Sequence, residues 1–293
     1  MSSAHTHAHT HTDGHTHTHS HTHTHSHSHT HLISDVRALR DDELGDRAQS
    51  RTIPDDEQTS AARAKAREDA SFDNLIALGN ALAFQMRYHE AIECYDKTVE
   101  LRPDDYGARR KRAGRYLSIL RLADADRELS WCVEHTNDVL DPKYMLGCCR
   151  YYAGDFDGAK ALFDECVELS KNDGDMYVAS LYWAVACSVR QGKSVASDMA
   201  KFNPDMEIGH HTGYMQSLKL FAGDAFCACD NIPVEDELQK HIFYYGAHLF
   251  YLAMRDAENA DRFLDKTLSL DTYFSAFAYL GAYTEYIAQN GAD

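Results

Sequence analysis

The segment HEAIECY at residues 89–95 decides the fold, because its alanine begins a register that recurs along the chain. Adding 34 residues to Ala91 gives Ala125 in LADADREL, and adding 34 again gives Ala159 in FDGAKALF. An ungapped repeat of this length is typical of arrays built from helical hairpins. The period therefore predicts an internal repeat from about residue 72 onward.

Two further registers agree with the alanines. A large apolar residue follows each alanine by four positions, and a small residue precedes it by twelve. These residues are Tyr95, Leu129 and Phe163, and Gly79, Ala113 and Gly147. The small residues let the two helices of one hairpin approach closely, while the large ones fill the groove between neighbouring hairpins. Because one hairpin cannot bury its apolar face alone, the pattern predicts a stack.

The pattern resembles the tetratricopeptide repeat family, strongly over residues 72–171 and again over 241–290. The first unit places Leu75, Leu78, Gly79, Leu82, Ala91, Tyr95 and Pro103 on signature positions, with Thr98 where a small alanine is usual. Later units keep Ala113, Tyr116, Ala125 and Leu129, then Leu146, Gly147, Ala159 and Phe163, and finally Tyr244, Tyr251, Ala260 and Leu264. The second unit lacks the closing proline.

The resemblance implies an all-α fold, a superhelical solenoid of about six hairpins with a capping helix at Tyr273–Ala288. From Ala159 to Ala260 is 101 residues, one short of three periods. We therefore expect two degenerate hairpins, at about 174–203 and 207–231. Gly192 and Gly223 are their predicted turns.

Composition divides the chain into three zones. Residues 1–31 alternate histidine with threonine and serine and cannot form a core, so we expect a disordered tail. Residues 32–71 are rich in charge and read as a linker, in which 56–70 can form a helix but has few apolar residues with which to dock. Residues 72–293 form the repeat domain.

Charge and targeting signals limit the function classes. The formal net charge is −17 with histidine neutral, which disfavours nucleic acid and anionic membranes as partners. No apolar run has the length of a membrane span, and no signal-peptide pattern begins the chain. Most of the 8 cysteines lie in apolar helical patterns, which favours buried thiols and a cytoplasmic protein.

Thirteen of the 19 histidines lie in the tail. They are His5, His7, His9, His11, His15, His17, His19, His21, His23, His25, His27, His29 and His31. Neutral imidazole is a good ligand for nickel, zinc and copper, so we expect many weak, interchangeable sites. The tail can equally be a tag, a tolerated repeat expansion, or a brush that gains charge below about pH 6.5.

In this family the first helices of the hairpins line the concave face, where peptides bind. The family's carboxylate clamp is mostly absent. Asn80 and Lys111 suit it, but Ile76, Asp141 and Met145 stand where polar or basic groups are needed.

Aromatic and basic residues are the remaining candidates for a binding face. The aromatic candidates are Phe84, Tyr144, Tyr151, Tyr152 and Tyr245, because tyrosine offers large rigid area with a polar tip. Core packing is the alternative for each of them.

The basic candidates belong to the cluster Arg109, Arg110, Lys111, Arg112 and Arg115. Arg110 and Lys111 are expected toward the groove, where they can anchor an acidic peptide. The alternative is a solvated helix face whose cations pair with acids such as Asp104, Asp105 and Asp124.

The sequence contains no nucleotide-binding, nucleophile-elbow, kinase or HExxH pattern, so we expect a protein that is not an enzyme and requires no cofactor. The function expected first is a scaffold that binds a protein or peptide on the concave face of the solenoid. The alternative is sequestration or delivery of nickel, zinc or copper by the tail. A third hypothesis combines the two, with the tail loading metal while the solenoid docks a client. The oligomeric state and the identity of the partner stay open.

Overall fold

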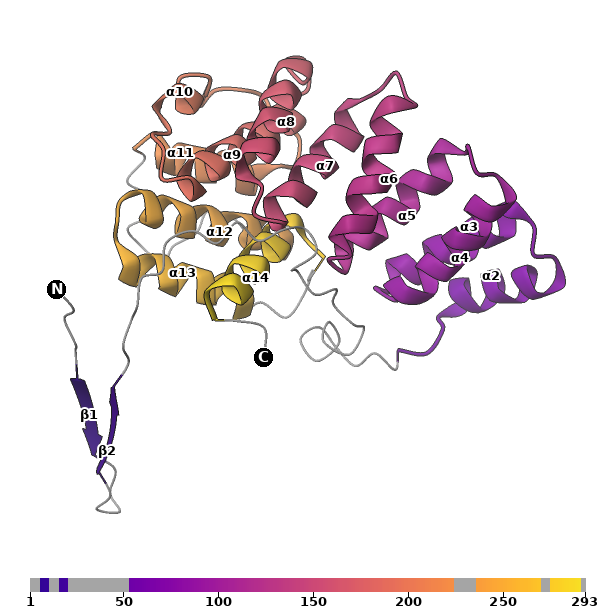
Figure 1. Ribbon diagram of the computed structural model, residues 1–293, viewed down its shortest axis with the longest axis horizontal. Helices are drawn as coiled ribbons and strands as arrows, with labels where there is room; N and C mark the ends of the chain where they lie inside the picture. The colour runs from indigo at the N-terminus through magenta and orange to yellow at the C-terminus, as the bar shows by residue number, and fades with distance from the viewer. Residues whose placement is uncertain (1–5, 11–15, 21–52, 224–235, 270–274, 291–293) are drawn as a thin grey trace. The chain divides into compact units, whose positions relative to one another are not determined.

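The computed structural model describes residues 6–10, 16–20, 53–223, 236–269 and 275–290 (Figure 1). The chain divides into two compact units, Met1–Thr30 and His31–Asp293. The described residues of the second unit contain helices and no strands.

The first unit contains strands β1 (Thr6–Thr10) and β2 (Thr16–Ser20), which pair antiparallel. The register sets His7 opposite His19 and His9 opposite His17. The predicted disorder of the tail otherwise falls on residues 1–5, 11–15 and 21–31, which lie outside the described residues.

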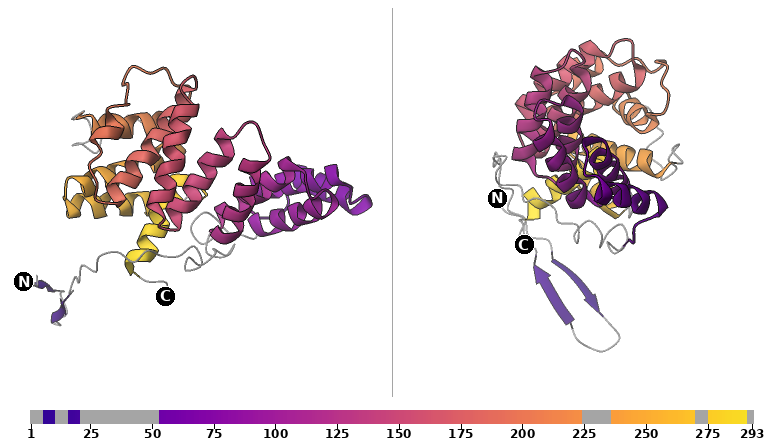
Figure 2. Two further views of the ribbon diagram at one scale, coloured as in Figure 1. Left: turned by 45° about the horizontal axis from the view of Figure 1, so that its top comes forward. Right: turned by 90° about the vertical axis from the view of Figure 1, so that its right-hand side faces the viewer.

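The second unit is an array of antiparallel helices, which confirms the all-α prediction (Figures 1 and 2). Its helices are α2 (Glu57–Glu68), α3 (Phe72–Phe84), α4 (Tyr88–Leu101), α5 (Tyr106–Ser118), α6 (Leu122–Glu134), α7 (Leu140–Tyr152), α8 (Phe156–Leu169), α9 (Gly174–Arg190), α10 (Ala196–Met199), α11 (Thr212–Phe221), α12 (Glu237–Ala253), α13 (Ala257–Ser269) and α14 (Phe277–Asn290). Consecutive long helices contact each other from α2 to α9 and again from α11 to α14.

The hairpins close as the small residues predict. A Cβ atom on Gly79 would lie 2.6 Å from Tyr95, and one on Gly147 would lie 2.8 Å from Phe163. The register alanines Ala91, Ala125, Ala159 and Ala260 are all 0% exposed. The 34-residue register therefore sets the distance between the two helices of each hairpin.

The turns inside the hairpins repeat one type of helix C-cap, although two of the three do not have the glycine that usually marks it. Met86, Leu120 and Gly154 lie 34 residues apart, and all three have a positive φ. The N–H of the following residue donates back to the helix, as from Arg87 to the carbonyl oxygen of Leu82 at 3.0 Å. This is the Schellman arrangement, in which glycine is usual. The predicted turn residues Gly192 and Gly223 also have positive φ, at 65° and 94°.

The helix α2 corrects the predicted linker. It begins after Asp56, whose carboxylate accepts from the Thr59 N–H at 2.7 Å. Its small side chains Ala62 and Ala66 pack against the core of the first hairpin, and Thr59 is 0% exposed. The expectation that this segment would not dock is wrong, because small and short polar residues can pack closely without a large apolar stripe.

Position explains why α2 docks. It lies about one period before α4, so it stands where the second helix of a preceding repeat would stand. Ion pairs stabilise the position of α2, because Arg63 donates to Asp55 at 2.6 Å and to Glu90 at 3.1 Å. The helical array therefore starts at residue 57.

The degenerate hairpins depart from the standard unit. In the fourth unit, α9 has 17 residues, while the second helix is reduced to the four residues of α10. In the fifth, α11 has 10 residues, and its predicted partner at 224–231 lies outside the described residues.

The main core extends from α4 to α14 around Trp183, which is 0% exposed. The capping helix α14 contacts α13 and α12, and it also contacts α7, more than a hundred residues earlier. Residues 273–274 of the predicted cap lie outside the described part. None of the helices in the described ranges is long and apolar enough to cross a membrane.

Candidate partner-binding face

The first helices of the hairpins present one face, which we call the first-helix face. It is defined by residues at matching register positions. These are Ile76, Arg110 and Tyr144, then Asn80, Gly114 and Cys148, and then Phe84, Ser118 and Tyr152. The candidates Asn80, Phe84, Arg110, Tyr144 and Tyr152 lie on these positions. Lys111 and Tyr151 are direct neighbours of them, and Tyr245 lies on α12.

On α3 this face is exposed. Asp73, Ala77, Asn80 and Phe84 form an exposed stripe, because residues three and four apart share one side of a helix. Phe84 is 84% exposed, the highest value among the large apolar side chains of the described residues. The amide oxygen of Asn80 accepts from the Tyr95 hydroxyl at 2.9 Å, which fixes the amide at the surface.

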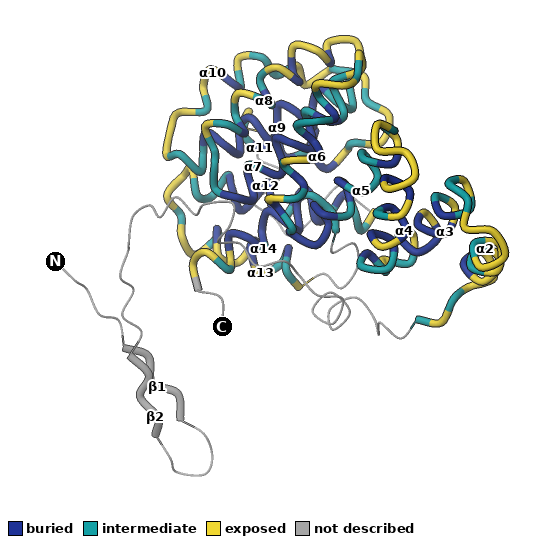
Figure 3. The backbone as a smooth tube through the Cα atoms, turned by 45° about the vertical axis from the view of Figure 1, so that its right-hand side comes forward, coloured by how far each residue is buried: buried dark blue, intermediate teal, exposed yellow. Residues whose placement is uncertain are grey.

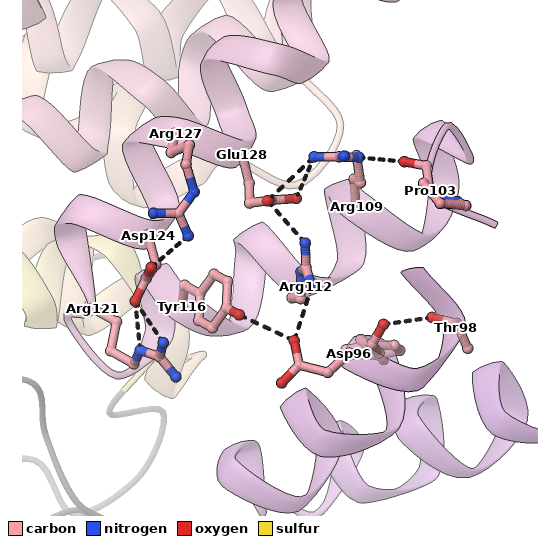
Figure 4. Close-up of polar contacts among 11 residues, drawn as sticks. Asp96, Thr98, Pro103, Arg109, Arg112, Tyr116, Arg121, Asp124, Arg127 and Glu128 are labelled. Carbon is pink, nitrogen blue, oxygen red and sulfur yellow. Dashed lines mark hydrogen bonds and ion pairs between the residues drawn. The ribbon is translucent and has the colours of Figure 1, made fainter. Parts of the chain in front are cut away.

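On α5 most of the basic cluster is already paired (Figure 4). Arg109 and Arg112 both reach Glu128, with nitrogen–oxygen distances of 3.3 and 2.8 Å, and Arg112 also reaches Asp96 at 2.9 Å. Glu128 is 3% exposed, so these ion pairs offset the cost of burying its carboxylate. The cluster thus pairs with acids, as the alternative expected, but the acids are Glu128, Asp96 and Asp141 rather than Asp104, Asp105 and Asp124.

Arg110 and Lys111 differ in their surroundings. Arg110 binds Asp141 of α7 through two nitrogen–oxygen contacts, 2.8 and 2.5 Å long, which raise the pKa of its guanidinium. Lys111 is half-buried and forms no ion pair with any residue in the described ranges. The guanidinium of Arg115 lies 5.0 Å from the ring of Tyr88. Lys111 therefore has a charge available for a partner, while Arg115 lies against an aromatic ring.

The same face is already covered at Gly114 and Ser118 of α5, which are buried. From α7 onward it stays covered, and the aromatic candidates are core residues (Figure 3). Tyr144, Tyr151 and Tyr152 are 6%, 3% and 3% exposed, and Tyr245 is 0% exposed. The expectation that these four tyrosines face an open groove is wrong in this conformation. Helices α11, α12 and α14 lie against them.

Hydrogen bonds among the tyrosine hydroxyls explain how so many fit in a core. The Tyr151 and Tyr245 hydroxyls are 2.7 Å apart, and those of Tyr144 and Tyr214 are 3.1 Å apart. The Trp183 indole N–H donates to the Tyr144 hydroxyl at 2.9 Å. A buried tyrosine needs such a partner. Burial raises the pKa of Tyr144 and Tyr245 well above the ordinary value.

The cysteines behave as buried core residues. Cys94, Cys132, Cys148, Cys149, Cys166 and Cys187 are free and buried. Burial raises the pKa of the Cys132 thiol to about 11 and that of Cys166 to about 12, so neither is a thiolate at neutral pH. Cys227 and Cys229 lie outside the described residues.

A candidate metal centre is not found in the part of the chain that the structure describes, where no three His, Cys, Asp or Glu side chains gather to hold an ion. Of the thirteen tail histidines, His7, His9, His17 and His19 lie on the two strands. The other nine lie outside the described residues.

Sequence reasoning missed one polar cluster, made by Arg190, His248 and Glu285. The carboxylate of Glu285 forms an ion pair with Arg190 and lies 3.2 Å from the Nε2 atom of His248. Burial alone would raise the pKa of Glu285, but its interactions with Arg190, His248 and Tyr245 outweigh burial and lower the pKa to about 2. A sequence signal was present, since Glu285 is the single charged residue of α14.

Comparison with known proteins agrees with this geometry. Residues 72–105 and 140–173 match the family model described as tetratricopeptide repeat. The chain contains tetratricopeptide repeats. The matched segments are the hairpins α3–α4 and α7–α8 with the turns that follow them, and the hairpin α5–α6 between them keeps the same register.

Two solved structures are similar to this chain. One is YrrB, described as a TPR protein with an unusual peptide-binding site, with 17% identity, a TM-score of 0.43, and coverage of 74% of this chain and 96% of that chain. The other is a tetratricopeptide repeat protein from Parabacteroides merdae, with 14% identity, a TM-score of 0.44, and coverage of 78% and 91%. A comparison with curated proteins found no match.

Proposed function

We propose that this chain is a non-catalytic interaction scaffold that binds a protein or peptide segment on the first-helix face of α3 and α5. The observation that carries the proposal is Phe84, a large aromatic side chain that is 84% exposed on the face its repeat directs toward partners. A large aromatic ring at such a position is the kind of side chain that anchors a binding partner. Asn80 beside it supplies an ordered amide.

Charge narrows the partner class. Lys111 is available on α5, whereas Arg109, Arg110 and Arg112 of that helix already form ion pairs and Arg115 lies against the ring of Tyr88. A segment with an apolar anchor and a carboxylate suits this combination, and the net charge of −17 makes nucleic acid or an anionic membrane a poor partner. We place the protein in the cytoplasm and assign no cofactor to the scaffold role.

The test is affinity capture with the full-length chain as bait, followed by binding measurements on the captured partner. The double variant Phe84→Ala/Lys111→Glu should lower affinity tenfold or more, in line with the loss of a hot-spot ring. Met254→Ala is the matched control, since Met254 is 64% exposed outside the face. Equal affinity of both variants for the partner would overturn the proposal.

Metal binding by the tail is the second candidate, carried by the thirteen histidines of residues 1–31. Titration of the full-length chain with nickel or zinc should show several weak sites. A chain lacking residues 1–31 should show none of them and should keep the partner. If partner capture needed both the tail and the metal, the combined function would replace the simple scaffold.

A further inference from the structure

The C-terminal helix α14 is unusual in where it places its charge. Glu285 is its single charged residue, and it is 4% exposed. A helix that only closes a repeat array turns a polar face to water, because the last repeat would otherwise expose apolar surface. Here the carboxylate points inward instead. Closing the array does not account for this placement.

The inward side of α14 carries three contacts at four-residue intervals. Phe277 comes first, and its ring lies 5.6 Å from that of Tyr144, edge to face. Gly281 comes second, and a Cβ atom there would lie 3.0 Å from Tyr245 and 3.2 Å from Trp183. Glu285 comes third. Four-residue spacing puts all three on one side of the helix.

Glu285 makes the polar contact between α14 and the surface beneath it, which we call the seat of α14 and which α7, α9 and α12 form. Its carboxylate pairs with Arg190 of α9, lies 3.2 Å from His248 of α12, and accepts from the Tyr245 hydroxyl at 3.2 Å. If Glu285 withdrew, the half-buried Arg190 would lose this carboxylate and His248 would lose the contact at its Nε2 atom. The seat therefore recognises a carboxylate specifically.

The surface under α14 belongs to the first-helix face. Tyr152 and Tyr144 of α7 occupy the register positions of Phe84 and Ile76 on α3. The Tyr152 hydroxyl donates to the Phe277 carbonyl oxygen at 2.8 Å. The helix α14 thus lies on the face that is exposed on α3.

We propose that α7, α9 and α12 form a helix-binding site that α14 fills as an internal ligand. In trans, the site takes a partner helix that carries an aromatic residue, a glycine and a carboxylate at four-residue intervals. The proposal rests on the proposed function in taking the first-helix face as the binding surface, and it adds an occupied site to the exposed one. A tethered helix competes at an effective concentration of about millimolar, so exchange requires a tight partner or a weakened α14.

A labelled peptide of residues 275–290 tests the site by fluorescence anisotropy with full-length chains. The Glu285→Gln chain should bind this peptide at least tenfold more tightly than the wild-type chain does. A peptide that itself carries Glu285→Gln should bind that chain at least tenfold more weakly. Glu93→Gln is the matched control, because Glu93 is exposed on α4, and it should behave as the wild type.

A second variant separates the site from a general loss of folding. Gly281→Ala crowds Tyr245 and Trp183, so it should weaken the packing of α14 while leaving Arg190 in place. It should gain affinity for the native peptide while circular dichroism keeps the helical signal of the array. If both variants stay folded and bind no better than wild type, or if both lose the helical signal throughout, α14 is an integral core helix and the proposal fails.

The outcome is independent of the exposed site. Phe84→Ala/Lys111→Glu should leave peptide binding unchanged, because neither residue contacts α14. If Phe84→Ala/Lys111→Glu loses the captured partner while the Glu285→Gln chain gains no affinity for the peptide, the internal-ligand proposal alone fails. The reverse result would sink the exposed site alone.

Discussion

The first hairpin (α3–α4) and the third (α7–α8) share the same repeat register, but equivalent side chains lie in opposite environments. Phe84 of α3 is 84% exposed, while Tyr152 of α7, two 34-residue periods later, is 3% exposed. The helices themselves match, since both hairpins fit the same family model. The difference is the cover that α11, α12 and α14 provide over α7. The repeat sets which way a side chain points, and distant helices decide whether that direction is surface or core.

The two regions also satisfy their polar groups differently. Around α5, guanidinium groups pair with carboxylates of α4 and α6 (Figure 4), and Arg110 pairs with Asp141 of α7. Around α7, tyrosine hydroxyls pair with one another and with Trp183. Both arrangements bury polar atoms with partners, but the second also buries large aromatic area. We therefore expect larger stability effects in the second region.

The largest effect should come from Trp183→Ala. Its side chain is 0% exposed, and its removal leaves a cavity among the rings of α7, α9 and α12, at a cost of about 3–5 kcal/mol. Phe84→Ala removes a ring of similar kind from water and should cost less than about 0.5 kcal/mol. Urea denaturation followed by circular dichroism compares the two. Similar losses would show that the two faces are not differently covered.

Glu285→Gln should have the next largest effect and the clearest pH dependence. The pKa of Glu285 is lowered from its ordinary 4.5 to about 2, so its stabilisation is complete above pH 4.5 and is lost as the pH falls toward 2. We expect the variant to be less stable by about 3 kcal/mol at pH 7. Denaturation of both proteins at pH 7, 5, 4 and 3 gives the difference. A difference that stays constant across this range would contradict the ion pair.

Glu128→Gln is the counterpart in the first region and should cost less, about 1–2 kcal/mol. Arg112 keeps Asp96 at 2.9 Å, and Arg109 keeps the Pro103 carbonyl oxygen at 2.6 Å, so neither cation is left alone. The same denaturation assay at pH 7 measures it. A loss greater than that of Glu285→Gln would reverse the ranking of the two regions.

The smallest effect should be a gain. Arg255 is exposed and has a φ of 59°, a backbone conformation that glycine adopts more easily. Arg255→Gly should raise the free energy of unfolding by about 0.5 kcal/mol. Leu120→Gly is the matched contrast, since Leu120 has a φ of 57° but is 0% exposed. Leu120→Gly should be destabilising, because the free energy lost with the buried side chain exceeds the backbone strain that is relieved. Thermal unfolding of both variants measures the two effects.

The sequence predicted the periodic part of the fold well. Ala91, Ala125 and Ala159 set helices that the structure confirms, because close packing of hairpins needs small residues at fixed intervals. It missed the docking of α2, because alanines and a buried threonine give no strong periodic apolar signal. The irregular fourth hairpin also escaped, since nothing in its spacing indicates a four-residue second helix.

The candidate site was harder to predict for a physical reason. Phe84 and Asn80 are exposed and Lys111 lacks an ion pair in the described ranges, as the binding hypothesis requires. Tyr144 and Tyr152 share their face by register but are covered by helices far along the chain, which no local pattern encodes. One indication of that cover was present in the sequence, namely a terminal helix with a single carboxylate.

Hydrogen exchange of the full-length chain, read by mass spectrometry, tests most directly whether α14 closes the first-helix face. If α14 is seated on α7, α9 and α12, amides within residues 277–290 should exchange as slowly as those of α7. Fast exchange throughout α14, with α7 still protected, would contradict the closed face and would make Tyr144 and Tyr152 surface residues after all.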